Sequence, residues 1–591
     1  MSEQQSGQNY NRGSTMLDYV IKGGTIVDGT GAARYQGDVG VKDGRIVAVG
    51  KVDEPAKETI DATGLVVSPG FVDIHTHYDA QIFWDPALSP SCYHGVTSVF
   101  AGNCGFSVAP LTADGSDYLM KMLARVEGMP LASLRDGVPW NWTSFGSYLD
   151  RVEERQPAVN VGFLVGHSAL RRAVMGEAAV DQAASPSQLE AMQKLLHQSL
   201  AEGGMGFSSS QAPTHNDGAG HPVPSRAATS QELIELSRCL RDHPGTLLEF
   251  IPTVGPFEER HMQLMTDMSL AAQRSLNWNV LIVNTGARAI YESQIKAADY
   301  AAERGATIRA LTFAQPVSLR LNLLSGFGLD ALPGWAAVLG LPLAARMAAL
   351  ADPATRARLI ENAAHPDVPV LLRAMGNFSA MTIEQTFSPA TKAYQGRGLA
   401  EVAAERKQSP ADAFFDIALA DELKTCFLPR LGGDDDESWA LRGAVWKDPR
   451  TLVGASDAGA HLDMIDTFAF STTVLGEGVR KRNLMTLEEG VHQITDLPAR
   501  FMGLKERGRI AVGWHADLVV FDADRIRKGP IHMRFDLPGD AGRLYCEAEG
   551  ISQVLVNGKV IVRNNQLTGN RPGTVLRSGR DTETVPIPAA G

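Results

Sequence analysis

The sequence predicts an α/β protein, a (β/α)8 TIM-like barrel with a small β-sandwich built from both chain termini. Three observations predict it. The chain has 591 residues, more than one compact core needs, so a large domain and a smaller one are expected. Both ends contain short alternating apolar runs, which are typical of antiparallel strands. Between them, strand-like apolar runs alternate with amphipathic helices, which is typical of a parallel barrel.

The two ends of the chain are predicted to pair with each other. Residues 1–16 are polar, and we expect a disordered tail there. Residues 17–68 contain DYVIKGGTIVDGTG and DVGVKDGRIVAVG, and residues 505–591 contain ISQVLVNGKVIVRNNQLTG. Because both segments alternate with a period of two, we assign 17–68 and 505–591 to one β-sandwich domain.

Residues 69–504 are assigned to the barrel. Strand-like runs such as GVTSVFAG, VNVGFLVGH and RTLVGASD are separated by helical runs such as SPSQLEAMQKLLHQSLAEG. Repeated short strands favour a barrel over an open sheet. The alternation is interrupted near 318–367, where we expect a helical and loop insertion that covers the mouth of the active site.

The composition disfavours some classes of binding partner. The chain is 44% hydrophobic and 21% charged, with a formal net charge of −12, which disfavours nucleic acid and anionic membranes as partners. Its five scattered cysteines form no CxxC pair, and its N-terminus lacks the apolar core of a signal peptide. We therefore expect a cytoplasmic protein with reduced thiols and no membrane span, and the expectation of a small-molecule substrate comes only from the motifs below. A homo-oligomer is compatible with this composition.

The strongest local signal is PGFVDIHTHYDAQ, in which an apolar strand runs into His75-Thr76-His77. Alternate residues on a strand point the same way, so His75 and His77 can converge on one metal ion at the carboxyl end of a barrel strand. A pair of surface histidines is the alternative, but the position directly after a strand favours metal binding.

The second signal is TLVGASDAGAH, in which a later strand ends at Asp457 in a loop of small residues. An Asp at this position can ligate a metal, or can take a proton from water and pass it to a leaving nitrogen. A helix N-cap is the alternative role. The HxH pair makes catalysis the preferred interpretation.

The third signal is GVTSVFAGNCGFSVAP, which places Cys104 directly after a strand. A thiolate there could ligate zinc, whereas an inert buried thiol is the common alternative.

Together with VNVGFLVGHSALR and LPARFMGLKERGRIAVGWHADLVVFD, these motifs resemble the D-aminoacylase (N-acyl-D-amino-acid deacylase) branch of the amidohydrolase superfamily. The resemblance spans nearly the whole chain and implies a metal-dependent barrel. It implies that His75 and His77 are the metal-binding pair of strand one and that Cys104 replaces a bridging carboxylated lysine. It also implies that Asp457 is the general base and acid, and that His167, in GHSALR, lies near the substrate. A hydrogen-bonded loop histidine is the alternative for His167.

The sequence departs from the family pattern at two histidines, expected on strands five and six. The corresponding segments read LLEFIP and LIVNTG, which puts Glu249 and Asn284 in those places. Glu can bind zinc, whereas neutral Asn suits calcium or manganese better. His461 is a further candidate, either as a replacement ligand or acid or as a substrate-binding residue.

The sequence therefore predicts a hydrolase that depends on one or two divalent ions, with zinc preferred, and cleaves the amide C–N bond of an N-acyl-D-amino acid or a related N-acyl compound. Two alternatives remain at this point. The first is hydrolysis of a cyclic amide, a lactam or another carbonyl substrate. The second is an inactive barrel that serves as a binding protein.

Overall fold

The computed structural model describes residues 16–112, 115–368 and 370–587. Most of the predicted tail, residues 1–15, therefore lies outside the described residues. Within them, no helix has the length and apolarity that a membrane crossing requires.

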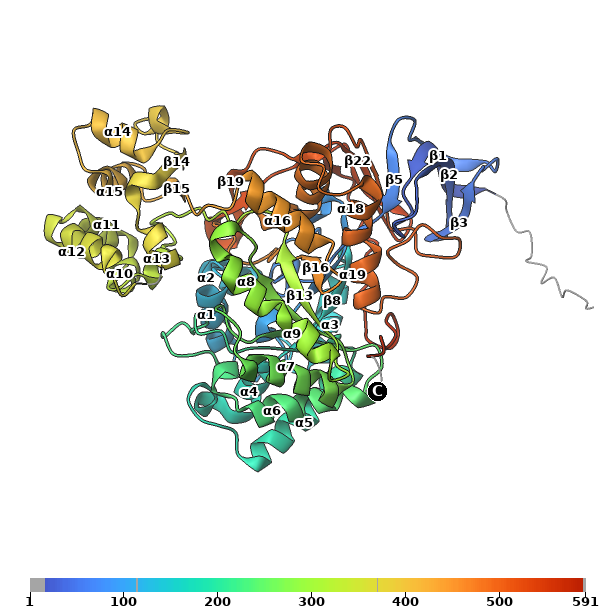
Figure 1. Cartoon of the computed structure of the whole chain (residues 1–591), viewed down its shortest axis with the longest axis horizontal. Helices are drawn as coiled ribbons and strands as arrows, with labels where there is room; N and C mark the ends of the chain where they lie inside the picture. Colours follow the sequence, from blue (N-terminus) through green and yellow to red (C-terminus); the bar gives the residue numbers. More distant parts are fainter. Residues whose placement is uncertain (1–15, 113–114, 369, 588–591) are drawn as a thin grey trace, which may run out of the picture.

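A parallel α/β core forms the centre of the molecule (Figure 1). One sheet has the order β6-β7-β8, and another has the order β16-β13-β12-β11-β10-β9. All neighbouring strands in both sheets are parallel. The strands are β6 (Phe71–Asp73), β7 (Val96–Ala101), β8 (Asn160–Phe163), β9 (Val165–Gly166), β10 (Gly206–Ser210), β11 (Leu247–Ile251), β12 (Leu276–Leu281), β13 (Ile308–Phe313) and β16 (Thr451–Gly454).

Helices connect these strands, as the amphipathic runs predict. In α5 (Pro186–Ala201), Ser185 caps the first turn and exchanges hydrogen bonds with Gln188, and Pro186 occupies the first helical position. The remaining helices of the core are α1 (Ser116–Val126), α2 (Leu131–Gly137), α3 (Phe145–Glu154), α4 (His167–Met175), α6 (Ser230–Arg238), α7 (Glu259–Ala272), α8 (Arg288–Gln294), α9 (Lys296–Ala302), α16 (Asp436–Trp446), α17 (Phe470–Thr473), α18 (Leu487–Ile494) and α19 (Asp496–Phe501).

Both ends of the chain join one nine-stranded sheet, whose main path is β24-β23-β22-β17-β5-β1-β2-β3, with β4 paired to β1. The two ends meet where β5 pairs antiparallel with β17. The strands are β1 (Leu17–Ile26), β2 (Tyr35–Lys42), β3 (Arg45–Gly50), β4 (Ala56–Asp61), β5 (Val66–Pro69), β17 (Leu518–Phe521), β22 (Ile551–Val556), β23 (Lys559–Arg563) and β24 (Gln566–Leu567).

Residues 505–591 do not all enter this sheet. Between β17 and β22 the chain forms two short ribbons, β18 (Arg527–Lys528) with β21 (Ala548–Glu549), and β19 (His532–Leu537) with β20 (Ala541–Tyr545). After β24 the chain returns to the core, where Leu576 donates a backbone hydrogen bond to Val161 of β8. Alternating apolar residues predict a strand but not the sheet that it joins.

Between β13 and β16 the chain forms a separate lobe, residues 318–430, which projects from one side of the molecule (Figure 1). Its hydrophobic core includes residues from Leu321 to Phe427 around the fully buried Trp335, together with Met464 from the chain after β16. Its elements are α10 (Trp335–Leu339), α11 (Leu343–Ala351), α12 (Pro353–Ala364), α13 (Val370–Met375), β14 (Met381–Gln385), α14 (Leu399–Glu405), α15 (Pro410–Ala420) and β15 (Cys426–Pro429). The lobe extends well beyond residue 367, where the predicted insertion ends. The sequence does not reveal this extension, because the later helices and strands of the lobe have the same periodicity as barrel elements.

A buried charge network anchors the lobe to the core. Asp466, 1% exposed, accepts hydrogen bonds from Lys528 at 2.7 Å and from Gln315 at 2.8 Å. Arg320 lies 3.6 Å from Asp466 and also pairs with Glu384 of β14. Burial opposes ionisation, but Lys528 and Arg320 lower the pKa of Asp466 from 3.8 to about 2.

We therefore expect Asp466 to stabilise the protein in a pH-dependent way. A carboxyl whose folded pKa is depressed contributes stability that is complete above its unfolded pKa and is lost as the pH falls through the folded one. In Asp466→Asn, denaturant unfolding should show reduced stability at neutral pH, and the deficit relative to wild type should shrink as the pH falls from about 4 toward about 2. Asp436→Asn, which changes a fully exposed side chain, is the control. A deficit that does not change with pH would contradict this role.

Candidate metal centre

Two histidines leave the end of β6 on the same side of the chain. The intervening Thr76 turns the other way, since its backbone N–H and its hydroxyl both donate to the carbonyl of Phe100, at 2.9 and 2.8 Å. His75 and His77 are each 1% exposed, and their ring centroids lie 5.4 Å apart. The alternation expected of a strand therefore continues past its end and brings both imidazoles together.

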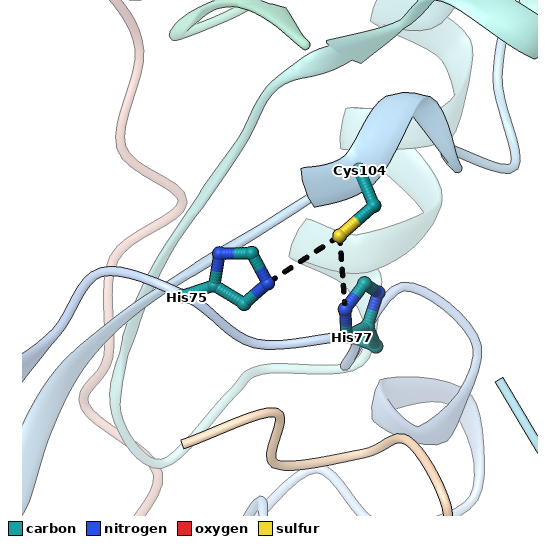
Figure 2. Close-up of side chains that lie close together, drawn as sticks. All are labelled: His75, His77 and Cys104. Carbon is teal, nitrogen blue, oxygen red and sulfur yellow. Dashed lines mark hydrogen bonds between the residues drawn. The ribbon is translucent and has the colours of Figure 1, made fainter. Parts of the chain in front are cut away.

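Cys104 comes from the turn after β7, in the short 3₁₀ helix η3 (Asn103–Gly105). Its Sγ lies 3.5 Å from Nε2 of His75 and 3.8 Å from Nε2 of His77 (Figure 2). Cys104 has a φ of +58°, a left-handed conformation that is uncommon for a residue with a side chain. The turn accepts this conformation where it points the thiol at both imidazoles.

Asp457 follows β16 and completes the group. Its Oδ1 lies 3.1 Å from Nε2 of His75 and 3.6 Å from Nε2 of His77. Two backbone hydrogen bonds fix this approach, from Asp457 N to the carbonyl of His75 at 3.2 Å and from His77 N to the carbonyl of Ala458 at 2.7 Å. The structure thus places the three strongest sequence signals in one cluster.

Glu249 also reaches this cluster. It lies within β11, fully buried, and its Oε2 accepts the backbone N–H of Cys104 at 2.7 Å. Its Oε1 is buried and has no hydrogen-bond partner among the described residues. Glu249 therefore positions the turn that carries Cys104 and leaves one oxygen free to act as a ligand.

The structure does not bring Asn284 to the cluster, so its prediction as a ligand is wrong. Asn284 lies beyond the end of β12, where its side chain caps a 3₁₀ turn by accepting the N–H of Ala287. Asn279, inside β12, takes the place instead: its Nδ2 lies 3.4 Å from Nε2 of His75 and 3.6 Å from Sγ of Cys104. The available signal was the polar pair Asn277 and Asn279 within an apolar strand.

Glu127 was missed by the sequence analysis. It lies directly after α1, 3% exposed, with Oε1 3.6 Å from Nδ1 of His77 and Oε2 4.0 Å from Nε2 of His461. His461 in turn donates its backbone N–H to the carbonyl of Glu127. His461 is therefore at the edge of the cluster, and no local motif around Glu127 announces this contact.

His167 lies outside the cluster, in a closed network of its own. Its Nδ1 lies 2.9 Å from the hydroxyl of Ser209 and its Nε2 lies 2.9 Å from Glu232, which also pairs with Arg171 at 2.5 Å. Because both ring nitrogens have partners and the side chain is fully buried, this geometry matches the hydrogen-bonded alternative and not substrate binding.

The whole chain resembles proteins of known chemistry. The model of the amidohydrolase family matches residues 58–562. The chain belongs to the amidohydrolase family. A model of the N-terminal domain of the urease α-subunit also matches, over residues 2–72.

Relatives place this amidohydrolase in the D-aminoacylase-like branch. It is 30% identical to N-acyl-D-aspartate deacylase of Alcaligenes xylosoxydans xylosoxydans, covering 95% of each chain, and 29% identical to D-aminoacylase of the same organism, covering 95% and 98%. A solved structure of N-acyl-D-glutamate deacylase from Bordetella bronchiseptica, with zinc and a phosphonate that mimics the tetrahedral intermediate, is 26% identical, with a TM-score of 0.64 and coverage of 95% and 100%.

The electrostatics of this amidohydrolase favour a cation at the cluster. Burial raises the pKa of Glu249 to about 8 and that of Glu127 to about 7. Burial, followed by the charge of Glu249, raises the pKa of the Cys104 thiol well above its usual value. Several buried acids thus face one another, and a divalent cation among them would stabilise their ionised forms.

We expect metal content to depend on the histidine pair. The double variant His75→Ala/His77→Ala should lose the bound divalent metal, because it removes two of the three donors that lie within 4.8 Å of one another. Elemental analysis of the purified proteins measures this. An equal metal content in wild type and double variant would contradict the assignment.

A second comparison separates the two asparagines. Asn279→Ala removes an amide within hydrogen-bond distance of the thiol and should weaken metal affinity, by about 10–100-fold if Asn279 acts as a typical partner of a metal ligand. Asn284→Ala should leave affinity unchanged, since its side chain only caps a turn. Competition with a chelator measures both affinities, and the opposite ranking would overturn the placement of Asn279.

Proposed function

We propose that this amidohydrolase hydrolyses the amide C–N bond of an N-acyl-D-amino acid or a related N-acyl compound, with a bound divalent metal. One observation carries the proposal: His75, His77, Cys104 and Asp457, from three different strand ends, converge at distances of 3.1–3.8 Å. The identities of the relatives support the choice of an N-acyl-D-amino acid.

The donor set fits a divalent ion. Two imidazole nitrogens and one thiol sulfur lie within 4.8 Å of one another, and Asp457 supplies a carboxylate beside them. Imidazole, thiolate and carboxylate together are the donors that zinc accepts. We assign His75, His77 and Cys104 as the holding residues, with Glu249 as a further ligand through its free oxygen. A metal of this kind, when bound, makes water more acidic and polarises a carbonyl group.

Asp457 carries the proton in this proposal. Burial opposes its ionisation, but the hydrogen bonds from His75 and His77 lower its pKa well below the usual value, so it is a carboxylate at neutral pH. Its side chain is 26% exposed, so a substrate and a water molecule can reach it. The carboxylate takes a proton from the attacking water and gives it to the leaving amine nitrogen.

We also infer that the parallel strands form one closed (β/α)8 barrel. Only Leu164 separates β8 from β9, so we count them as one interrupted strand, and the three-stranded and six-stranded sheets then supply eight strands. The bridge between Thr76 and Ala458 supports closure between β6 and β16. We infer in the same way that the terminal sheet folds over as a sandwich around the apolar cluster that includes Ile21, Val41 and Leu518.

Asp457→Asn tests the catalytic assignment. The amide keeps the shape of the side chain but cannot accept the proton, so kcat on an N-acetyl-D-amino acid should fall by about 10²–10⁴-fold. Hydrolysis is measured on a panel of acylated D-amino acids, acylated L-amino acids and cyclic amides, with Asp436→Asn beside it as a matched Asp→Asn change at a fully exposed side chain outside the cluster. Near-normal turnover in Asp457→Asn would refute the role, and turnover of cyclic amides alone would refute the substrate class.

A further inference from the structure

A cavity of about 470 Å³ lies between the core and the lobe and is lined by residues of α1, α2 and the lobe. Its volume is in the range of small-molecule binding sites. Six segments line it: the end of α1 with the start of α2, residues 322–330, Arg346 of α11, Lys424, Asp463, and the β19–β20 hairpin. Most of the lining is apolar and includes Met129, Leu131, Phe327 and Met533.

The cavity borders the metal centre through Gly128. A β-carbon at Gly128 would lie 3.3 Å from Nδ1 of His461 and 3.5 Å from the ring of Phe327. Gly128 also has a φ of +56°, so both its space and its conformation favour glycine. Its neighbour Glu127 contacts His77 and His461. Gly128 therefore touches both the cavity and His461, at the edge of the cluster.

The basic groups of the cavity wall are already engaged. Arg125 pairs with Asp330, Arg346 donates to the carbonyls of Leu323, Leu324 and Leu341, and Lys424 pairs with Glu422. The wall also carries a buried acid, Asp463, which accepts a hydrogen bond from the neutral amide of Asn322. Burial raises the pKa of Asp463. Among the described residues, each basic side chain of this wall already donates to groups of the protein, so a substrate carboxylate would have to compete with these partners.

We propose that this cavity binds the apolar acyl chain of an N-acyl substrate and selects for acyl chains longer than acetyl. The inference rests on the proposed function. An amino-acid side chain bound in the cavity would also bring its own α-carboxylate toward a wall that carries the buried acid Asp463. The acyl chain is the other apolar end of such a substrate, and the scissile amide separates it from the carboxylate.

The first test uses a series of N-acyl-D-amino acids with one amino acid and acyl chains from acetyl to decanoyl. Each buried methylene contributes about 0.8 kcal/mol, so kcat/KM should rise about fourfold per methylene until the cavity is full. Ala541→Trp on the hairpin and Ala124→Trp on α1 fill the cavity from two different lining segments and should abolish this rise. Ala201→Trp, at an exposed position of α5, is the matched control and should retain it.

Metal content equal to wild type shows that each filled variant has folded. A flat chain-length series in wild type, or an undiminished rise in both folded filling variants, would overturn the proposal.

A binding measurement separates this inference from the proposed function. Neutral primary amides from acetamide to decanamide are titrated calorimetrically into His75→Ala/His77→Ala, with and without Ala541→Trp. Affinity that rises with chain length and is lost on filling supports the cavity even if no N-acyl-D-amino acid is hydrolysed. If N-acyl-D-amino acids are hydrolysed but neither assay shows an effect of chain length, the proposed function stands and the cavity does not bind the acyl chain.

Discussion

The paired backbone hydrogen bonds between the chain after β6 and the chain after β16 are the constraint on which the centre depends. They join Asp457 to His75 and His77 to Ala458. Without them, two loops from opposite ends of the strand order would have to hold buried imidazoles against a carboxylate by side-chain contacts alone. With them, the backbone orients the three side chains, and Asp457 accepts a left-handed φ of +48° at the contact.

The thiol of Cys104 is also oriented through its backbone. Glu249 acts on Cys104 through the backbone and not through the sulfur. It holds the backbone N–H of Cys104 and so fixes the direction of the side chain. Burying Glu249, Glu127 and Asp79 in one region costs free energy, since each charged form loses its hydration. The raised pKa of each of the three shows this cost, and a bound cation would offset it.

How far the sequence predicts the structure depends on the range of the interactions. Strand alternation is local, so it correctly brings His75 and His77 together, and the turns after β7 and β16 supply Cys104 and Asp457. Asn284 is the polar residue of LIVNTG, the segment that corresponds to strand six of the family pattern, but the strand ends at Leu281. Asn279, five residues earlier, lies within the strand and contacts the cluster, whereas Asn284 caps a turn. Glu127 enters through tertiary packing after a helix, and no periodicity marks it. The predicted insertion begins at the true start of the lobe. Its end was not predicted, because helical and strand patterns do not show which hydrophobic core an element joins.

The lobe and the centre are built so that one can vary without the other. The lobe has a hydrophobic core of its own, and the network of Arg320, Asp466 and Lys528 attaches it to the core at a point nine residues beyond Asp457 in the chain. Substitutions of Arg346 therefore change the wall of the cavity without breaking the backbone bonds that hold His75 and Asp457. The reacting groups come from strand ends, whereas the proposed recognition wall comes from the α1–α2 segment, the lobe and the β19–β20 hairpin. Changes of substrate range are therefore expected to arise in this second set of segments. The chemistry then stays with the strands, because the geometry of the four donors tolerates little displacement.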